Sequence, residues 1–453
     1  MSDEFIFHGS IADLDPNLRR LLDLEDQRQR ETIILIPSES MSPDAVREAM
    51  SSRFGNIYAE GYPREESRRQ TEAEILDIDQ ELAHYHRYSD PRYYKGVEFA
   101  DLLEALTRRR AAELFAANGL SAGQIYVNVQ PLSGAPANSA VYTALLEPGD
   151  TLMGLNLDDG GHLSHGSKVN RSGKIYNPVS YFVDPETETL DYDAIEQIAL
   201  AARPKIIVAG YSAYPHIVDW ARFRAIADQC GAYLLADIAH ISGLVAAGVH
   251  PSPIGIADVV TTTTHKTLRG PRGGLILMKE EHAKAINSAI FPGLQGGPLM
   301  HVIAAKATAF KEAMKPTFKN YQEQVIANAR VMARVLGEER GLRIVSGGTE
   351  SHVFLVDLRN KHVTGKVAEA ALGMAHITVN KNAIPNDPEK PFVTSGIRLG
   401  SPAMTTRGFT EIEAEKIAHL VADVLDAPDD VANLERVRAQ VSALCAKFPV
   451  YGD

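Results

Sequence analysis

The chain has 453 residues, 45% of them hydrophobic and 23% charged, which is typical of a globular protein with two domains or one large domain and an appendage. Its 58 acidic residues outnumber the 46 basic ones and give a net charge of -12, so we predict no nucleic-acid partner and no binding to anionic membranes. With only Cys230 and Cys445, no leader pattern at the start and no apolar run near about 18 residues, we predict a cytoplasmic protein without disulfides or a metal centre.

Short apolar runs alternate with helical patterns between residues 112 and 279. In the run "WARFRAIADQC", Trp220, Phe223 and Ile226 fall on one helical face, and the flanking runs are short and rich in branched residues. Strand, helix and strand in this order predict parallel strands joined by right-handed crossovers. We therefore predict a large α/β unit over residues 31–314.

The pattern changes after residue 291. A helix is predicted for "LMHVIAAKATAFKEAMKP", and strands for "HVFLVDL" and "GIRLGSPA". Thr410 and Glu413 form a capping box that begins the last clear helix. We predict a smaller α+β unit over residues 315–453 and an N-terminal arm over residues 1–30.

Polar side chains follow two apolar runs of the large unit. In "VVTTTTHKTLRGPRGG", residues 259–274, the β-branched threonines favour a strand that breaks at Gly270, which places Lys266 at or just past its end. The run "LLADIAH" ends with Asp237 and His240. Open α/β sheets place their sites at such strand ends. An acid, an imidazole and a lysine there suit a cofactor with a basic ring nitrogen and an aldehyde.

Pyridoxal phosphate is such a cofactor. Lysine holds its aldehyde as a Schiff base, and a buried carboxylate keeps its ring nitrogen protonated. The stretch "QPLSGAPAN", residues 130–138, offers backbone N–H groups and small side chains for a phosphate at a helix start. An imidazole above the ring would come from "DDGGHLSHG", residues 158–166.

Each of these residues also has a purely structural interpretation. A lysine after a strand is usually a solvated charge, and an aspartate often caps a turn. His162, His165 and His240 could be structural histidines or, less in keeping with their spacing, metal ligands. The ordered set of phosphate loop, imidazole, acid and lysine is much less expected by chance than any one member.

Several long motifs together closely resemble serine hydroxymethyltransferases. They are "YAEGYP", "NVQPLSGAPAN", "YTALLEPGD", "GGHLSHGS", "VVTTTTHKTLRGPRGG", "FPGLQGGPLMHV", "ITVNKNAIPNDP" and "VTSGIRLGSPA". The resemblance runs from about residue 15 to the C-terminus. It implies the aspartate-aminotransferase fold (fold type I) and a homodimer with shared active sites. Whether two such dimers join into a tetramer is left open. It also implies interconversion of serine and glycine with pyridoxal phosphate as cofactor and tetrahydrofolate as one-carbon acceptor.

The resemblance assigns one set of residues to the cofactor. Lys266 would form the Schiff base, Asp237 would contact the pyridine nitrogen, and His240 would lie near the phenolic oxygen. The remaining cofactor residues are His162 stacked on the ring, Ser133, Gly134, Ala135, His265 and Ser212, with Tyr58, Gly296 and Gly297 from the neighbouring subunit.

Two further sets concern the substrates. Arg398 would pair with the amino-acid carboxylate, and Glu60 would act as the acid–base residue at the substrate hydroxyl. The amino-acid site would hold Arg398, Ser38, Glu60, Tyr94 and Arg272, and the folate site Glu60, Tyr93, Leu157, Gly161, Leu163 and Asn382. The resemblance thus names Lys266, Glu60, His162 and Tyr94 as catalytic.

This sequence departs from the family pattern mainly at residues 64–91, where an extra segment separates "YAEGYP" from "RYY". Ile75, Ile78, Leu82 and Tyr85 share one helical face, so we predict an ordered helix with one packed side. It would either narrow the folate pocket or extend the dimer surface. Ala135 also stands where the family usually has serine.

Two other functions remain open on the sequence alone. One is a sister activity on the same scaffold, namely a folate-independent aldolase on β-hydroxy amino acids or a hydroxymethyltransferase for α-methylserine. The other is a non-catalytic binding scaffold, against which the retention of Lys266, Asp237 and Arg398 argues, because a scaffold needs none of them.

Overall fold

The structure is a computed structural model of the chain and describes residues 9–88 and 91–451. Residues 1–8 of the predicted arm, 89–90 of the predicted extra segment and 452–453 of the predicted C-terminal unit lie outside these ranges. Within the described ranges, no helix is both long and apolar enough to cross a membrane.

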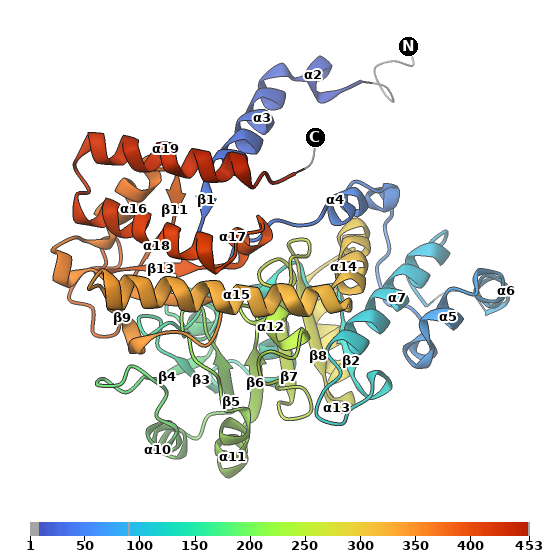
Figure 1. Cartoon of the computed structure of the whole chain (residues 1–453). Coiled ribbons are helices and arrows are strands. Elements are labelled where there is room, and N and C mark those ends of the chain that lie inside the picture. The colour runs from blue at the N-terminus through green and yellow to red at the C-terminus, as the bar shows by residue number, and fades with distance from the viewer. Residues whose placement is uncertain (1–8, 89–90, 452–453) are drawn as a thin grey trace.

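A seven-stranded sheet lies at the centre of the molecule, in the order β2-β8-β7-β6-β5-β3-β4 (Figure 1). Among these seven strands, β8 alone runs in the opposite direction to the other six, so the sheet is mostly parallel. This confirms the predicted α/β fold class. The strands are β2 (Tyr126–Asn128), β3 (Thr151–Leu155), β4 (Asn177–Tyr181), β5 (Ile206–Gly210), β6 (Tyr233–Asp237), β7 (Val259–Thr263) and β8 (Gly274–Met278).

Alternate side chains of the sheet point into two separate cores, because successive strand residues face opposite sides. On β5, Ile206 and Val208 belong to one core, and Ile207 and Ala209 to the other. Helices α8 (Gly134–Leu145) and α13 (Glu280–Ser288) pack in the first core. The second core contains α7 (Glu98–Leu114), α10 (Tyr192–Ala202), α11 (Trp220–Cys230) and α14 (Met300–Ala313).

A smaller antiparallel sheet, in the order β12-β13-β10-β9, forms with its helices the second part of the molecule. Its strands are β9 (Arg343–Ile344), β10 (Val353–Asp357), β12 (Asn380–Asn382) and β13 (Gly396–Gly400), and β1 (Ile33–Ile34) pairs with β11 (Ile377–Thr378) nearby. Ile33 and Leu35 lie in the core of this smaller part. The predicted divisions at residues 31 and 315 stay predictions, and Ile33 and Leu35 pack in the core of the smaller part although they were assigned to the large unit.

The remaining helical elements connect or cover these sheets. They are α2 (Ile11–Leu14), α3 (Pro16–Glu31), α4 (Asp44–Met50), η1 (Arg53–Asn56), η2 (Glu65–Arg69), α5 (Glu72–Ile75), α6 (Ile78–Tyr88), η3 (Ala122–Gln124), α9 (Arg171–Ile175), α12 (Ser242–Ala246), η4 (Ala289–Leu294), α15 (Pro316–Arg334), η5 (Val335–Glu339), η6 (Val345–Gly347), η7 (Arg359–Lys361), α16 (Gly365–Met374), α17 (Pro402–Thr406), α18 (Glu411–Asp426) and α19 (Val431–Lys447).

Several predicted elements occur where the sequence places them. The threonine run forms β7, the chain turns at Gly270, and β8 restarts at Gly274. The helix predicted near residue 300 is α14, and the predicted C-terminal strands are β10 and β13. Thr410 and Glu413 form the expected capping box of α18.

In its described residues, the segment 64–91 forms the short 3-10 helix η2 and then two α-helices, α5 and α6, instead of the single helix that its apolar spacing predicts. The break follows from Asp77, whose carboxylate accepts a hydrogen bond from the backbone N–H of Gln80 and so starts a new helix. Ile75 is fully buried, but Ile78 is 38% exposed, so only part of the predicted face is packed. In Figure 1 both helices lie at the side of the molecule, beyond α7.

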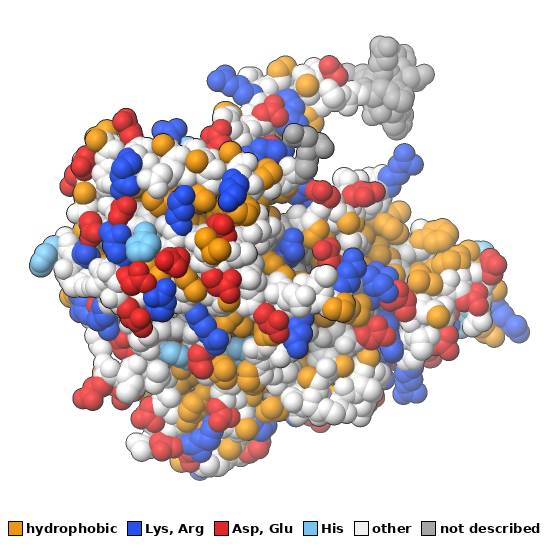
Figure 2. All heavy atoms as spheres, viewed as in Figure 1, with side chains coloured by type: hydrophobic (Ala, Val, Ile, Leu, Met, Phe, Trp, Pro, Cys, Tyr) orange, Lys and Arg blue, Asp and Glu red, His pale blue; other side chains and the backbone are white. Residues whose placement is uncertain are grey.

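The N-terminal helices α2 and α3 extend from the body beside α19 (Figure 1). Neither α2 nor α3 has a buried residue. Leucine side chains along both helices are exposed, by fractions that range from 41% at Leu22 to 75% at Leu14. On the face seen in Figure 2, acidic and basic side chains are interspersed.

Candidate active site

Ten of the predicted site residues line one pocket at the carboxyl ends of β5, β6 and β7 and the start of α8. This is where an open α/β sheet places its ligands. The ten are Ser133, Gly134, Ala135, His162, Ser212, Asp237, His240, His265, Lys266 and Arg272.

Lys266 follows β7 by three residues and is 9% exposed. Burial lowers the pKa of its amine to about 8, against an opposing effect of the negative charge on Asp237. The turn that follows is tight, because Gly270 N donates to Thr264 O at 2.7 Å. A Cβ at Gly273 would lie 2.5 Å from Lys306 Cε, so a side chain there would displace the end of the buried Lys306. The result is a buried amine that is partly neutral near pH 8 and therefore nucleophilic.

Asp237 is the last residue of β6 and is held by three donors. Its Oδ2 lies 2.9 Å from His165 Nε2 and accepts from Asn138 Nδ2 at 2.8 Å, while Oδ1 accepts from Ala239 N at 3.0 Å. Burial by itself would raise the pKa of Asp237, but the hydrogen bond to His165 and the nearby imidazoles hold it below the usual range. Asp237 is therefore a buried carboxylate that stays ionised.

The tautomer of His162 follows from its neighbours. Its Nδ1 accepts from Ser164 N at 3.2 Å and lies 2.7 Å from Ser164 Oγ. Ser164 Oγ accepts from Asn138 Nδ2 at 2.9 Å, which leaves its own hydrogen for His162. Burial lowers the pKa of His162 to about 4, so the ring is neutral at physiological pH with its proton on Nε2.

The start of α8 forms a cradle suited to a phosphate. Ser133 is its N-cap, yet the serine side chain makes no capping hydrogen bond and remains available. A Cβ at Gly134 would lie 2.9 Å from Thr263 Cγ2, so the helix start approaches the end of β7 closely. Backbone N–H groups of a first helical turn bind anions.

The residues in this pocket fit pyridoxal phosphate. The pocket offers a buried amine for the aldehyde, an ionised carboxylate for the ring nitrogen and the start of α8 for the phosphate. His265 Nδ1 is also buried without a hydrogen-bond partner among the described residues, as expected beside a polar ligand.

Arg398 on β13 brings a guanidinium from the smaller part of the molecule. Its Nη1 donates to Ser212 O at 2.7 Å and its Nε to Asn380 Oδ1 at 3.1 Å. Within residues 9–88 and 91–451, no carboxylate forms an ion pair with it. Burial lowers its pKa to about 10, so it stays charged at neutral pH. A buried guanidinium of this kind is suited to a carboxylate ligand.

The predicted acid–base residues form a second cluster. The rings of Tyr58 and Tyr94 are 4.8 Å apart, and a Cβ at Gly296 would lie 3.4 Å from Glu60 Oε1. A Cβ at Gly297 would lie 3.2 Å from Tyr58 Cε1. The charge on Glu60 raises the pKa of Tyr58 above its usual range. None of these five residues lines the Lys266 pocket. The predicted site residues of one chain therefore fall into two groups, the Lys266 pocket and the Glu60 cluster.

The other predicted residues do not line the Lys266 pocket itself. Ser38 lines an adjoining hollow together with His265 and Arg272. Leu157 and Leu163 are each 44% exposed. The predicted folate residues come from three separate stretches of the chain: Tyr93 beside Tyr94, Leu157, Gly161 and Leu163 in the loop after β3, and Asn382 on β12.

A hollow between the large and small parts adjoins two of these folate residues. It is lined by Asn156, next to Leu157, and by Ala383, next to Asn382. Asp159 also lines it, and burial raises the pKa of that carboxyl to about 6.

Comparison with known proteins decides the family. The sequence profile of the serine hydroxymethyltransferase family matches residues 11–87 and 83–421. The chain belongs to the serine hydroxymethyltransferase family. Serine hydroxymethyltransferases of Azoarcus sp. (strain BH72) and Dechloromonas aromatica (strain RCB) are each 60% identical to it, over 449 and 448 residues, covering 99% of this chain and 100% of the relative. That of Nitrosomonas europaea is 56% identical over 444 residues, 98% of this chain and 99% of its own.

The match to the serine hydroxymethyltransferase family falls into two parts that overlap at residues 83–87, inside the segment 64–91. The structure attaches this segment to α7 and α14, where Glu72 pairs with Arg110 at 2.9 Å and with Lys311 at 3.1 Å.

Two polar residues beside Asp237 belong to the site although the sequence did not predict them there. His165 was considered only as a structural or metal-binding histidine, and Asn138 only as part of a phosphate loop. Thr261 Oγ1 donates to Asn138 Oδ1 at 2.6 Å and fixes the direction of the amide. The need of a buried carboxylate for donors was a signal, but sequence could not say which donors reach it.

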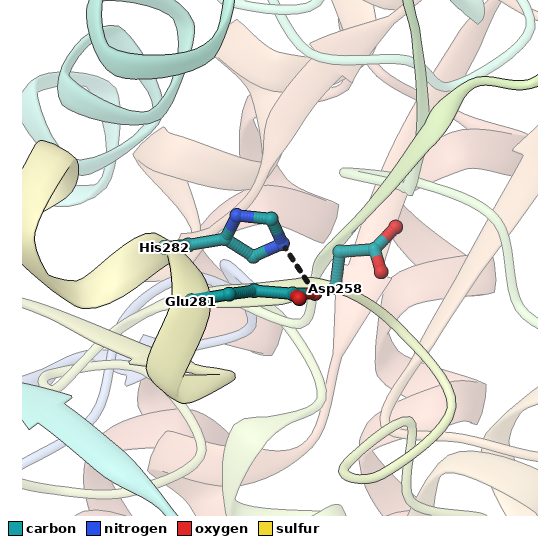
Figure 3. A group of neighbouring side chains, drawn as sticks. All are labelled: Asp258, Glu281 and His282. Carbon is teal, nitrogen blue, oxygen red and sulfur yellow. Dashed lines mark ion pairs between the residues drawn. The ribbon is translucent and has the colours of Figure 1, made fainter.

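One cluster of possible metal ligands lies away from this pocket, namely Asp258, Glu281 and His282 (Figure 3). His282 Nε2 is 3.4 Å from Glu281 Oε1. Asp258 already pairs with Arg224 at 2.7 Å and Lys279 at 2.6 Å, and its pKa lies below the usual range although burial opposes this. With two cations on its carboxylate, the cluster is an ion-pair network and we assign no metal to it.

Proposed function

We propose that this protein interconverts serine and glycine and exchanges the one-carbon unit with tetrahydrofolate, with pyridoxal phosphate as cofactor. The observation that carries the proposal is the convergence of Lys266, Asp237 and His162 on the start of α8, in a chain that is 60% identical to named serine hydroxymethyltransferases over 99% of its length.

The Lys266 pocket would hold the cofactor, which when bound supplies an electron sink for a carbanion at the amino-acid α-carbon. Lys266 would bind the aldehyde carbon through its partly neutral amine. Asp237 would keep the proton on the ring nitrogen, because its carboxylate stays ionised. His162 would pack on the ring as a neutral imidazole, and the Ser133 hydroxyl with the N–H groups that follow would bind the phosphate.

The amino-acid substrate would be oriented by Arg398, whose guanidinium has no carboxylate partner within the described ranges. The hydrogen bond from Arg398 to Ser212 O holds the guanidinium at the edge of the pocket. Ser38 and Arg272, which line the adjoining hollow, would contact the same substrate.

Glu60 would exchange a proton at the substrate hydroxyl, with Tyr94 beside it. Its cluster would complete the pocket of a neighbouring subunit, together with Tyr58, Gly296 and Gly297 at the phosphate. Folate would lie against Tyr93, Leu157, Gly161, Leu163 and Asn382, along the hollow between the two parts of the molecule.

A homodimer with shared sites is therefore part of the proposal. Two observations support it. The residues of the Glu60 cluster do not line the Lys266 pocket of their own chain, and Tyr58 among them is 56% exposed. Helix α3 presents exposed leucines and has no buried residue of its own. The choice between dimer and tetramer and the cytoplasmic location stay predictions.

The test is glycine formation from serine by the purified, cofactor-loaded protein, with and without tetrahydrofolate. Strong folate-dependent turnover is the expected result. Allo-threonine and α-methylserine are run beside serine, and no feature of the structure favours either one. Cleavage of one of them while serine stays inert with folate would contradict the proposed substrate.

A further inference from the structure

The backbone that carries Glu60 is bound by the residues that follow the extra segment. Arg92 Nη1 donates to Ala59 O at 2.7 Å and to Gly61 O at 3.1 Å. Tyr93 N donates to Glu60 O at 3.1 Å. Three consecutive carbonyl groups, one on each side of Glu60 and its own, are thus held by residues 92–93.

Arg92 is itself fixed by buried partners. Its side chain is fully buried, and Nη2 donates to Glu104 Oε2 at 2.7 Å, also fully buried. Its Nε donates to Asp101 Oδ1. Gln130 joins the same network, since its Nε2 donates to Gly61 O at 2.8 Å and lies 3.0 Å from Glu104 Oε1. A buried network with its charges paired holds its members in one arrangement.

The extra segment starts and ends at this network. A Cβ at Gly61 would lie 3.1 Å from Arg92 Cα, so the chain leaves and returns at nearly the same place. Gly61 has φ +109, which favours glycine at the point of departure. The segment has its own attachment farther out, where Glu72 pairs with Arg110 and Lys311. The segment 64–91 is therefore also held by ion pairs of its own, away from the backbone of Glu60.

We propose that Arg92 is a positioning residue for Glu60, which fixes the backbone on both sides of that residue and makes its geometry independent of the segment 64–91. The proposal rests on the proposed function, in which Glu60 exchanges a proton at the substrate hydroxyl. A displacement of about 1 Å at a reacting group can lower a rate about 100-fold, so a backbone clamp of this kind has a measurable effect.

The test variant removes the clamp without leaving the fully buried charge of Glu104 behind, although Asp101, whose side chain is 15% exposed, also loses its ion pair with Arg92. Replacing Arg92 alone would strand Glu104, so the change is the pair Arg92→Met and Glu104→Gln. Arg92→Lys is the conservative variant, since it keeps a cation for Glu104 but loses the fork that reaches two carbonyls. The matched control is Arg64→Met with Glu81→Gln, which removes a 2.7 Å ion pair inside the extra segment.

The readouts separate positioning from general damage. For the paired Arg92 variant we expect kcat for folate-dependent serine cleavage to fall about 100-fold, with KM for serine within about threefold. Glycine has no hydroxyl for Glu60 to act on, so its affinity and that of the cofactor should be unchanged. Arg92→Lys should recover part of kcat, and the control pair should stay within about twofold of the parent protein.

A double-mutant cycle with Glu60→Gln decides the matter. If Arg92 acts through Glu60, the paired Arg92 change costs about 100-fold in the parent protein and less than about threefold in the Glu60→Gln protein. Losses that multiply, or equal losses of glycine and cofactor binding, would overturn the proposal and leave Arg92 as a structural residue. Should the paired variant fail to fold, the same cycle with Arg92→Lys carries the test. Absence of folate-dependent turnover in the parent protein would instead contradict the proposed function.

Discussion

The Lys266 pocket and the Glu60 cluster differ in how far a single chain encloses them. In the Lys266 pocket, Lys266 and Asp237 are each 9% exposed, and the carboxylate has its donors from within the chain. In the Glu60 cluster, Tyr58 and Tyr94 are 56% and 44% exposed. In the proposed homodimer, the sheet of one chain would provide the walls of the cofactor pocket, whereas the cluster on loops would need the surface of the second chain to exclude water from it.

The strongest test of this contrast is Lys266→Ala. Loss of the amine that binds the cofactor aldehyde should lower turnover by about 10⁴-fold or more. Dialysis followed by a visible spectrum measures the cofactor that remains. Turnover within tenfold of the parent protein would contradict the role of this half.

Asp237→Asn should have the next largest effect. The amide cannot keep a proton on the cofactor ring nitrogen, so we expect kcat to fall about 10²–10³-fold with the fold retained. The control is Asp258→Asn, a similar change in the ion-pair network outside the pocket. It should lower thermal stability and leave kcat within about twofold, and equal losses of kcat in the two variants would argue against a specific role of Asp237.

The rate at which the apo-protein takes up pyridoxal phosphate should depend on the protonation of Lys266. Burial lowers the pKa of this amine to about 8, and only the neutral amine attacks an aldehyde. Uptake should therefore rise about tenfold per pH unit below pH 8 and level off above it. A rate that continues to rise to pH 10 would show that Lys266 keeps an ordinary pKa.

Mixing two strongly impaired variants tests whether the halves belong to different subunits. Lys266→Ala and Glu60→Gln proteins are unfolded and refolded together. Random pairing in a dimer with shared sites restores about a quarter of the parent activity, because half of the dimers hold one intact site. No recovery, with dimers demonstrated by sedimentation, would place both halves in one subunit.

The smallest effect is expected at the extra segment. Glu72→Gln removes the ion pairs to Arg110 and Lys311 and should cost about 0.5–1 kcal/mol of unfolding free energy, without changing kcat. Hydrogen bonding by Arg110 lowers the pKa of Glu72 to about 2, so this stabilisation is present above pH 4.5 and is lost as the pH falls towards 2. Thermal unfolding at pH 7 and pH 3 measures both, and a tenfold loss of kcat would connect the segment to the site.

Local patterns predicted much of the fold correctly. The threonine run, the turn at Gly270 and the capping box at Thr410 depend on residues close in sequence, so each could be read from the chain. The helix break at Asp77 was missed, because apolar spacing continues across it while a single aspartate starts the second helix. Ile33 and Leu35 join the smaller core through a strand pair with residues some 340 positions away, which no local pattern predicts.

The sequence by itself determined the family, the alternation of strands and helices, and ten of the fourteen residues that line the pocket, because long motifs and strand ends depend on order along the chain. Only the tertiary structure decided that His165 and Asn138 hold Asp237, that Arg398 carries no carboxylate partner among the described residues, and that Arg92 binds the backbone around Glu60. These are contacts between residues far apart in sequence, and folding selects among many polar side chains the few that reach each buried group.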